Sequence, residues 1–288
     1  MNKKLLESHK VQTELENLRI SDYNTGSFII INSKTAFKKH LKKSLVYLNG
    51  ERAFSSDYIK NNDIIEIYLD ESTNNKPIID LGLEIIYEDD YLAVVNKPAG
   101  IIVSGNKHWT IQNALPNNLK NSSQKDALKR PEPIHRLDYP TSGALLIGKT
   151  SKAIMLLNEM FKEKKIKKKY HAVTIGKMKE TGVISFKIDN KPSETIYEVL
   201  QSIPSPKYTF LNLVELNPLT GRKHQIRKHL AGIGHPIFGD LLYGKEGLVL
   251  KGKGLYLHAS SLRFIHPFNQ ESIDMNIPLP NKFIHLFS

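Results

Sequence analysis

The chain has 288 residues, with 41 lysine and arginine residues against 29 aspartate and glutamate residues, a formal net charge of +12, 40% hydrophobic residues and no cysteine. The lack of cysteine excludes a disulfide scaffold, a thiolate zinc site, an iron–sulfur cluster and a cysteine nucleophile. The hydrophobic content allows a sizeable core, and the basic excess favours a polyanionic partner such as nucleic acid. With neither a secretion signal nor 18 successive apolar residues, we expect a cytoplasmic protein without a membrane span.

The first quarter of the chain has the pattern of a small separate module. A strand-like FIIIN segment is followed by a lysine-rich helical stretch over 35–44 and by two more strands, VYLNG and DIIEIYL. Asn49-Gly50 is typical of a type I′ hairpin turn, because both central residues of that turn need positive φ. Before the module we expect a tail or frayed helix, and after it a polar, proline-containing linker. The predicted division of the chain is a tail (1–26), a module (27–70), a linker (71–80) and a main domain (81–288).

Short β-like runs dominate the main domain: LEIIY, YLAVVNK, ALLIGK, YHAVTIG, GVISFKI, TIYEVL, TFLNLVEL and LYLHASSLRF. Helical periodicity interrupts them twice, with one apolar stripe in SKAIMLLNEMFKEK and another in GRKHQIRKHLAGIG. We expect the second helix to have Thr220 as its N-cap and to stop at Gly232 or Gly234. Many strands and few helices, without regular alternation, predict an α+β domain with a mostly antiparallel central sheet and flanking helices.

The most unusual segment is PIHRLDYPTSGALLIGKT, from Pro133 to Thr150. It places Arg136, Asp138 and a rigid turn residue in a loop just before a buried-looking strand, an arrangement typical of functional loops on a rigid support. An Asp that only opens an Asx turn is nevertheless the commoner explanation for such a loop. The residues of this segment alone do not decide between the two.

Two further segments are dense in basic residues. In NPLTGRKHQIRKHLAGIGHPIFGD, helical spacing places Arg227 at the edge of the apolar face, where an inward-pointing guanidinium would need an anion. A solvated arginine that snorkels to the surface is the alternative. In KEKKIKKKYHAV, six lysines run into Tyr170. This pattern fits either a solvated cationic helix end or a phosphate-binding edge with an aromatic ring for base stacking.

Other kinds of site lack support in the sequence. The 11 histidines form no HExxH motif, and His224 and His229 are five residues apart, out of register for a shared helical metal face. A P-loop, a GxGxxG turn and a GxSxG nucleophile elbow are all missing. The sequence therefore gives no support to a metal site, a nucleotide-binding site or a hydrolase nucleophile.

Taken together, the three segments resemble the RNA pseudouridine synthases of the RluA family. HRLDYPTSG (135–143) is similar to the family's HRLDxxTSG catalytic motif, and Tyr139-Pro140 stand where relatives often have polar residues. The pieces IIYEDDYLAVVNKPAGIIVS, KKYHAV, NPLTGRKHQIRKHLAGIGHPIFGDLLYG and LYLHASSLRFIHP agree with the family in order and spacing, over roughly residues 83–270. In the first module, VYLNGERAFSSDYIKNNDIIEIYL resembles the tail of an S4-type RNA-binding module, so we expect a small S4-like α/β module there.

The resemblance implies an isomerase that converts uridine to pseudouridine in structured ribosomal or transfer RNA, a reaction that needs neither a cofactor nor a metal. The sequence leaves the oligomeric state open, and we expect a monomer by default. It implies that Asp138 attacks a flipped-out uridine, at C1′ of the sugar or C6 of the base. Arg227 would pair with that aspartate, and Tyr170 would stack on the target base and help to take the C5 proton. Arg136 would fill the gap that the flipped nucleotide leaves. The residues expected to contact RNA are Arg136, His135, Lys165, Lys168, Arg222, Lys223, His224 and Lys228.

Two other classes of function remain as alternatives. A non-catalytic RNA-binding or ribosome-assembly protein could keep the fold and the basic groove, but we would expect it to have lost Asp138, Tyr170 or Arg227. All three are present. A carbohydrate or nucleoside hydrolase needs a second carboxylate or an activated water, and Glu132, between two prolines, is poorly placed to provide a shared site.

Overall fold

The computed structural model describes residues 3–13, 17–23, 28, 31, 34–70, 77–249, 252 and 254–288. The chain divides into two compact units, Met1–Lys76 and Pro77–Ser288. Residues 71–76 of the expected linker lie outside the described residues, and so does most of the expected FIIIN strand.

The N-terminal unit contains a small antiparallel sheet and a helix. The sheet has the order β1, β6, β3, β4, formed by Lys3–Lys10, Ile64–Asp70, Val46–Leu48 and Glu51–Arg52. Two short strands, β2 (Leu18–Arg19) and β5 (Tyr58–Ile59), pair beside a 3-10 turn over Ile20–Asp22. Helix α1 (Lys34–Lys42) buries Phe37 and Leu41 in the core of this unit. Asn49 and Gly50 have φ of 53° and 84°, which confirms the expected hairpin turn.

One expectation for this unit is wrong. Residues 3–10 form strand β1, paired antiparallel with β6, and not a tail or a frayed helix. Strand β1 is stabilised by its hydrogen bonds to β6, which is far away in the sequence. The local pattern of apolar residues in 3–10 does not indicate this pairing. His9 shows the same dependence, because its ring packs against Tyr23 and Phe28 from later in the chain.

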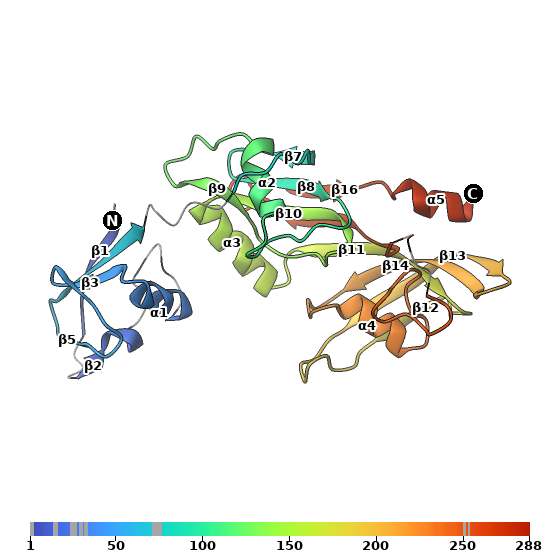
Figure 1. Ribbon diagram of the computed structural model, residues 1–288, viewed down its shortest axis with the longest axis horizontal. Coiled ribbons are helices and arrows are strands. Elements are labelled where there is room, and N and C mark those ends of the chain that lie inside the picture. The colour runs from blue at the N-terminus through green and yellow to red at the C-terminus, as the bar shows by residue number, and fades with distance from the viewer. Residues whose placement is uncertain are drawn as a thin grey trace. The chain divides into compact units, whose positions relative to one another are not determined.

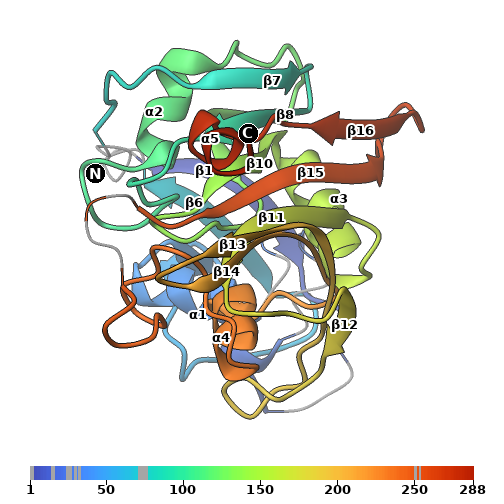
Figure 2. The ribbon, with the colours of Figure 1, turned by 90° about the vertical axis from the view of Figure 1, so that its right-hand side faces the viewer.

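The larger unit is built on a sheet of ten strands among its described residues (Figures 1 and 2). The main path runs β12, β13, β14, β11, β15, β10, β8, β7, with β9 pairing to β10 and β16 to β15. The strands are β7 (Glu84–Glu88), β8 (Leu92–Lys97), β9 (Ala127–Pro133), β10 (Ser142–Thr150), β11 (Lys167–Ile175), β12 (Thr181–Ile184), β13 (Thr195–Ser205), β14 (Thr209–Pro218), β15 (Leu257–Ile265) and β16 (Ser272–Asn276). Apart from a short parallel contact between β10 and β15, the pairs are antiparallel, which confirms the expected α+β fold.

The helices of this unit are α2 (Ile111–Asn118), α3 (Ser151–Lys162), α4 (Gln225–Gly232) and α5 (Asn281–Phe287). Helix α3 confirms the first predicted helix. Helix α4 confirms the second and ends at Gly232 as expected, but it begins later than predicted. Thr220 is not its N-cap, because it lies five residues before the first helical residue, Gln225, whose side chain accepts from the Thr220 hydroxyl (2.7 Å). His224 occupies the N-cap position, in a left-handed conformation with φ of 56° and without a side-chain capping bond.

The central strands are buried on both faces. Ala93 and Val95 of β8 belong to the same apolar cluster as α2, whereas their neighbours Leu92 and Val94 belong to the cluster that contains α3. Strand β10 alternates in the same way, because successive side chains of a strand point to opposite faces. This double burial explains the continuous apolar runs in the sequence. It also gives the loop before β10, residues 138–141, a rigid support.

Gly143 is where β10 meets β15. It pairs with Ala259, and Ala259 pairs on its other side with Tyr170 of β11, so one row crosses three strands. The backbone at Gly143 has φ of 112°, and a Cβ there would lie 2.1 Å from the carbonyl oxygen of Ala259. A side chain would therefore force the two strands apart.

We predict that Gly143→Ala lowers the free energy of unfolding of the larger unit by about 3 kcal/mol or more, from overpacking together with a strained φ. Gly234→Ala is the matched control, since Gly234 has a similar φ of 86° but nothing within 4 Å of its Cβ position. It should cost only about 1 kcal/mol. Urea unfolding followed by the fluorescence of Trp109 measures both, and equal losses would contradict the prediction.

Candidate active site

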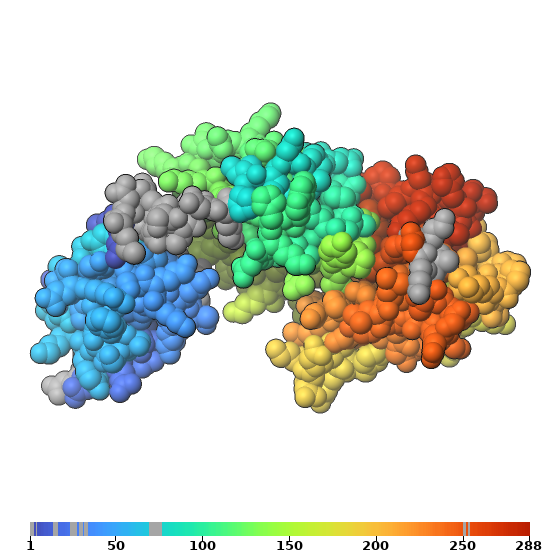
Figure 3. Space-filling model, viewed as in Figure 1, coloured from blue at the N-terminus to red at the C-terminus, as the bar shows by residue number. Residues whose placement is uncertain are grey.

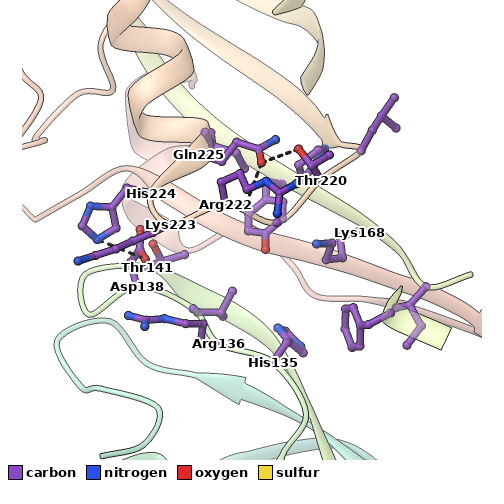
Figure 4. A pocket seen from close by; sticks show the side chains of 18 of the residues that line it. His135, Arg136, Asp138, Thr141, Lys168, Thr220, Arg222, Lys223, His224 and Gln225 are labelled. Carbon is purple, nitrogen blue, oxygen red and sulfur yellow. Dashed lines mark hydrogen bonds and ion pairs between the residues drawn. The ribbon is translucent and has the colours of Figure 1, made fainter. Parts of the chain in front are cut away.

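A cleft of about 830 Å³ opens in the larger unit. Its walls come from residues 134–141 before β10, residues 161–170 at the end of α3 and in β11, and residues 217–227 between β14 and α4. In Figure 3 the green and orange parts of this unit, which include the first and third of these segments, lie next to each other. Figure 4 shows His135, Arg136 and Asp138 on one wall and Arg222, Lys223 and His224 on the facing wall.

Asp138 is half-buried in this cleft, in a tight turn where the amide of Thr141 donates to the Asp138 carbonyl (3.1 Å). Its two carboxylate oxygens face two different side chains. Arg227 Nη1 lies 3.6 Å from Oδ2, and His224 Nε2 lies 3.7 Å from Oδ1. The structure thus brings together Asp138 and Arg227, which are 89 residues apart in the sequence, and adds His224, which we expected to contact RNA.

Asp240 is the main partner of Arg227. The guanidinium donates two hydrogen bonds to the Asp240 carboxylate, from Nε (2.8 Å) and Nη2 (2.7 Å), and both side chains are buried. Asp240 also accepts from the amides of Leu242 (2.9 Å) and Tyr243 (3.1 Å). Burial alone would raise the pKa of Asp240, but these bonds hold it below the ordinary value. Arg227 therefore points inward to an anion, the Asp240 carboxylate. Asp240 uses only Nε and Nη2, so Nη1 faces Asp138.

Tyr243 joins the two groups that face Asp138. The Arg227 guanidinium lies over the Tyr243 ring, 5.0 Å from its centroid, and the Tyr243 hydroxyl lies 2.9 Å from His224 Nδ1. Burial, opposed by the charge of Asp138, lowers the pKa of His224, so its imidazole is neutral at pH 7. The Asp138 carboxylate, which can only accept, lies beside Nε2 and favours the tautomer with its proton there, in which Nδ1 accepts from the Tyr243 hydroxyl.

Tyr170 lies in β11 with only 9% of its surface exposed and forms part of the cleft. Burial and the nearby charge of Asp138 raise its pKa above the ordinary value, so its hydroxyl keeps its proton at neutral pH. The ring lines the cleft in the same row of the sheet as Gly143. The cleft thus combines one carboxylate, a fixed guanidinium and an aromatic surface.

Comparison with known proteins shows the family to which the chain belongs. The family model for RNA pseudouridylate synthase matches residues 91–232. The tRNA pseudouridine synthase C of Vibrio parahaemolyticus is 34% identical over 235 residues, 72% of this chain and 94% of that protein. The ribosomal large subunit pseudouridine synthase D of Xanthomonas campestris is 30% identical over 282 residues, 89% of this chain and 84% of that protein. The chain belongs to the RNA pseudouridylate synthase family.

A solved structure agrees with this. Human RNA Pseudouridylate Synthase Domain Containing 1 is 28% identical, with a TM-score of 0.57, over 68% of this chain and 83% of that one. The resemblance to the RluA family is therefore confirmed, and the protein is an isomerase that converts uridine in RNA to pseudouridine.

Lys97 supports the loop that carries Asp138, residues 138–141, and was not predicted from the sequence. Its ammonium is buried and donates to the carbonyls of Thr141 (2.8 Å), Pro98 (2.8 Å) and Tyr139 (3.4 Å). Burial, opposed by the charge of Asp138, lowers the pKa of Lys97 to about 8. The only signal in the sequence is a lysine that ends an apolar strand, LAVVNK, just before a proline.

His258, in β15, contacts the first residue of β10, directly after this loop. Its Nδ1 lies 2.9 Å from the Ser142 hydroxyl, and 1% of the residue is exposed. Burial, with a smaller contribution from His171, lowers the pKa of His258 from 6.5 to about 4. Between these two values the unfolded chain binds a proton that the folded synthase does not bind.

The stability contributed by a neutral His258 is therefore complete above pH 6.5 and decreases as the pH falls towards 4. The slope is up to about 1.4 kcal/mol per pH unit. Urea unfolding of the wild type and His258→Asn at a series of pH values in this range measures it. We predict a steeper pH dependence for the wild type, and parallel curves would contradict the prediction.

The basic residues expected to bind RNA fall into two groups. Those that line the cleft are His135, Arg136, Lys168, Arg222, Lys223 and His224. Lys165 and Lys228 are not among the lining residues: Lys165 pairs with Glu163 (2.7 Å), and Lys228 pairs with Asp189 (3.0 Å). His135 Nε2 accepts from the amide of Leu146 (3.0 Å). Burial lowers the pKa of His135 to about 3, so it adds no positive charge.

The cleft also contains Lys162, Lys164 and Lys167 of the KEKKIKKKYHAV run, which were not among the residues expected individually to contact RNA. Burial lowers the pKa of Lys168. Among the described residues, no cluster of three or more His, Asp or Glu side chains is suited to hold a metal ion. The described helices are also too short or too polar to cross a membrane.

Proposed function

We propose that Asp138 is the nucleophile of this synthase and that its substrate is a uridine in structured ribosomal or transfer RNA. The observation that carries the proposal is that Asp138 is the only carboxylate among the described residues that line the cleft. A hydrolase of the glycosidase type needs two such groups, whereas covalent catalysis needs one. The names of the bacterial relatives, which specify ribosomal and transfer RNA, support the substrate class.

The isomerisation proceeds by attack of the Asp138 carboxylate on the flipped-out uridine. Attack at C1′ of the ribose expels uracil through N1, and attack at C6 of the base adds the carboxylate to the ring. In either route the glycosidic bond to N1 breaks, uracil turns and C5 bonds to C1′. Asp138 leaves as a free carboxylate, displaced from C1′ by C5 in the first route and eliminated from C6 in the second. C5 then loses its proton and N1 gains one, so the net change is the isomerisation of uridine. Flipping is required because the reacting atoms are not accessible in a stacked helix.

The surrounding residues prepare this step. Arg227, fixed by Asp240, orients the carboxylate, and Arg136 fills the gap that the flipped nucleotide leaves. Tyr170 stacks on the target base. The raised pKa of Tyr170 means that its hydroxyl stays protonated at neutral pH and is not available as a base. We therefore assign Tyr170 to stacking rather than to removal of the C5 proton. The cationic walls bind phosphates, with Lys165 and Lys228 contributing from outside the cleft.

The N-terminal unit adds a second basic surface. We propose that it is a separate S4-like RNA-binding module, joined to the catalytic domain by a linker at residues 71–76. The expected linker over 71–80 is too long, because residues 77–80 belong to the larger unit, where Ile79 is buried in the core. The lysines of α1 and its end support this, because they are exposed while the apolar residues between them are buried: Lys34, Lys38, Lys39, Lys42 and Lys43. We further propose that the protein acts as a monomer in the cytoplasm, where bacterial ribosomal and transfer RNA are located.

Mapping of pseudouridine tests the proposed function. Total RNA from cells that lack the gene, and from cells rescued with the wild type or Asp138→Asn, is labelled with carbodiimide and read by primer extension. We expect a site that disappears on deletion and returns only with the wild type. If no site changes, the non-catalytic RNA-binding alternative replaces this proposal.

A further inference from the structure

The Asp138 loop also borders a second hollow, of about 490 Å³, to which the reaction assigns no role. We call it the Trp109 groove. Its lining is mostly apolar, with one cationic residue and no acidic residue: Leu81, Pro98, Ala99, Gly100, Ile101, Ile102, Lys107, Trp109 and Tyr139. Tyr139 follows Asp138 directly in the chain, so the groove and the cleft share this loop.

Two large aromatic side chains are exposed in this groove. Trp109 is 57% exposed and Tyr139 is 58% exposed, although both rings carry large apolar surfaces that folding usually buries. Exposed apolar surface gathered in one hollow is typical of a binding site. Lys107 is exposed beside them and adds a positive charge.

The backbone beneath both rings is fixed. The carbonyl of Tyr139 accepts from the amide of Gly100 (2.8 Å) and from Lys97 Nζ (3.4 Å). The turn that carries Trp109 is held by Asn113, whose side-chain amide donates to the carbonyls of His108 (2.8 Å) and Lys107 (3.3 Å). Rings on a fixed backbone lose little conformational entropy when a ligand binds, so the groove is preorganised.

From this geometry we infer that the Trp109 groove binds an unpaired base of the substrate RNA next to the target uridine. The base stacks on Trp109 and Tyr139, and its phosphate pairs with Lys107. The groove and the cleft share no lining residue, but they lie on the same loop, because Tyr139 directly follows Asp138 in the chain. A strand with its uridine at Asp138 would thus have a neighbouring nucleotide within reach of Tyr139. Aromatic rings with an adjacent cation suit a nucleobase and its phosphate. The inference rests on the proposed function of Asp138.

Trp109 is the only tryptophan in the chain, so its fluorescence reports on the groove directly. The Asp138→Asn protein is titrated with a short RNA stem–loop that has an unpaired uridine and purine neighbours, and with a fully paired RNA duplex. Gel shift measures binding of both probes. We expect the stem–loop to quench the fluorescence and the duplex to bind without quenching. Binding of the stem–loop with unchanged fluorescence would overturn the inference.

Paired substitutions separate stacking from packing. Trp109→Leu and Tyr139→Leu keep apolar volume but lose the aromatic face, and each is expected to raise the dissociation constant for the stem–loop about tenfold. Trp109→Tyr and Tyr139→Phe keep an aromatic face and should restore most of the affinity. Lys107→Gln should reduce the slope of the logarithm of the binding constant against the logarithm of the salt concentration by about one. Val183→Ala, an exposed apolar residue that lines neither hollow, is the control expected to match the wild type.

The two proposals can fail separately. If the wild type forms no pseudouridine in cells, the proposed function of Asp138 fails, whereas quenching by the stem–loop would still show a base in the groove. If the wild type forms pseudouridine and the two leucine variants bind and react with an unchanged KM, the groove is not an RNA subsite and the inference is overturned.

Discussion

Asp138→Asn is expected to lower kcat for pseudouridine formation by about 10⁴-fold or more, because an amide of the same size is not a nucleophile. RNA binding should change little, since the basic residues on both walls of the cleft remain. Single-turnover reactions with RNA labelled with tritium at C5 of uridine measure the chemical step, and filter binding measures the affinity. Asp274→Asn is the control, because Asp274 lies on the surface and pairs only with Arg263 and its own neighbour Asn276.

A substantial residual rate in Asp138→Asn would contradict the proposed mechanism. No other carboxylate lines the described part of the cleft, so the reaction would then have to proceed without covalent attack by a side-chain carboxylate. A loss of RNA binding equal to the loss of rate would instead show that Asp138 acts in binding.

The second large effect is expected at Asp240. Asp240→Ala should lower the free energy of unfolding of the larger unit by about 3–5 kcal/mol, since it leaves the Arg227 guanidinium buried without its main partner. It should also reduce kcat by about 100-fold, because Arg227 is then free to move away from Asp138. Urea unfolding and single-turnover kinetics measure the two effects on the same protein.

A double substitution separates stability from catalysis. Arg227→Met combined with Asp240→Leu replaces a buried ion pair by apolar side chains, which should restore most of the lost stability. It should not restore the rate, because nothing then orients the Asp138 carboxylate. If the double variant reacts as fast as the wild type, Arg227 and Asp240 serve packing alone.

The helices and strands that could be predicted from the sequence are of two kinds. Some have buried side chains on both faces, and others have one face buried along the whole element. Strands β8 and β10 are buried on both faces and appear as continuous apolar runs, and α3 buries one stripe. Four elements of the larger unit were not predicted. Strand β9 contains Pro131 and Pro133, α2 contains Pro116, and both β16 and α5 are short segments with few buried side chains. Their stability comes from the neighbours on which they pack.

The candidate site divides in the same way. Asp138 and Arg227 could be found because a local motif and a helical face point to them. Asp240, Tyr243 and Lys97 could not, since each acts through a partner that only the fold brings near. Asp240 lies 13 residues after Arg227, beyond the end of α4, and no periodicity connects the two.

Strand β15 determines when the site can exist. It lies between β10 and β11, yet it is the last of the long strands to leave the ribosome. Before it is made, β7, β8 and β10 carry Asp138 as one half-sheet, and β11 to β14 carry Tyr170 as another, with no strand to join them. We therefore expect a nascent or truncated chain that ends before Leu257 to hold Asp138 and Tyr170 on separate half-sheets and not to modify RNA. On this expectation, the order of strands in the sheet delays activity until synthesis of the catalytic unit is almost complete.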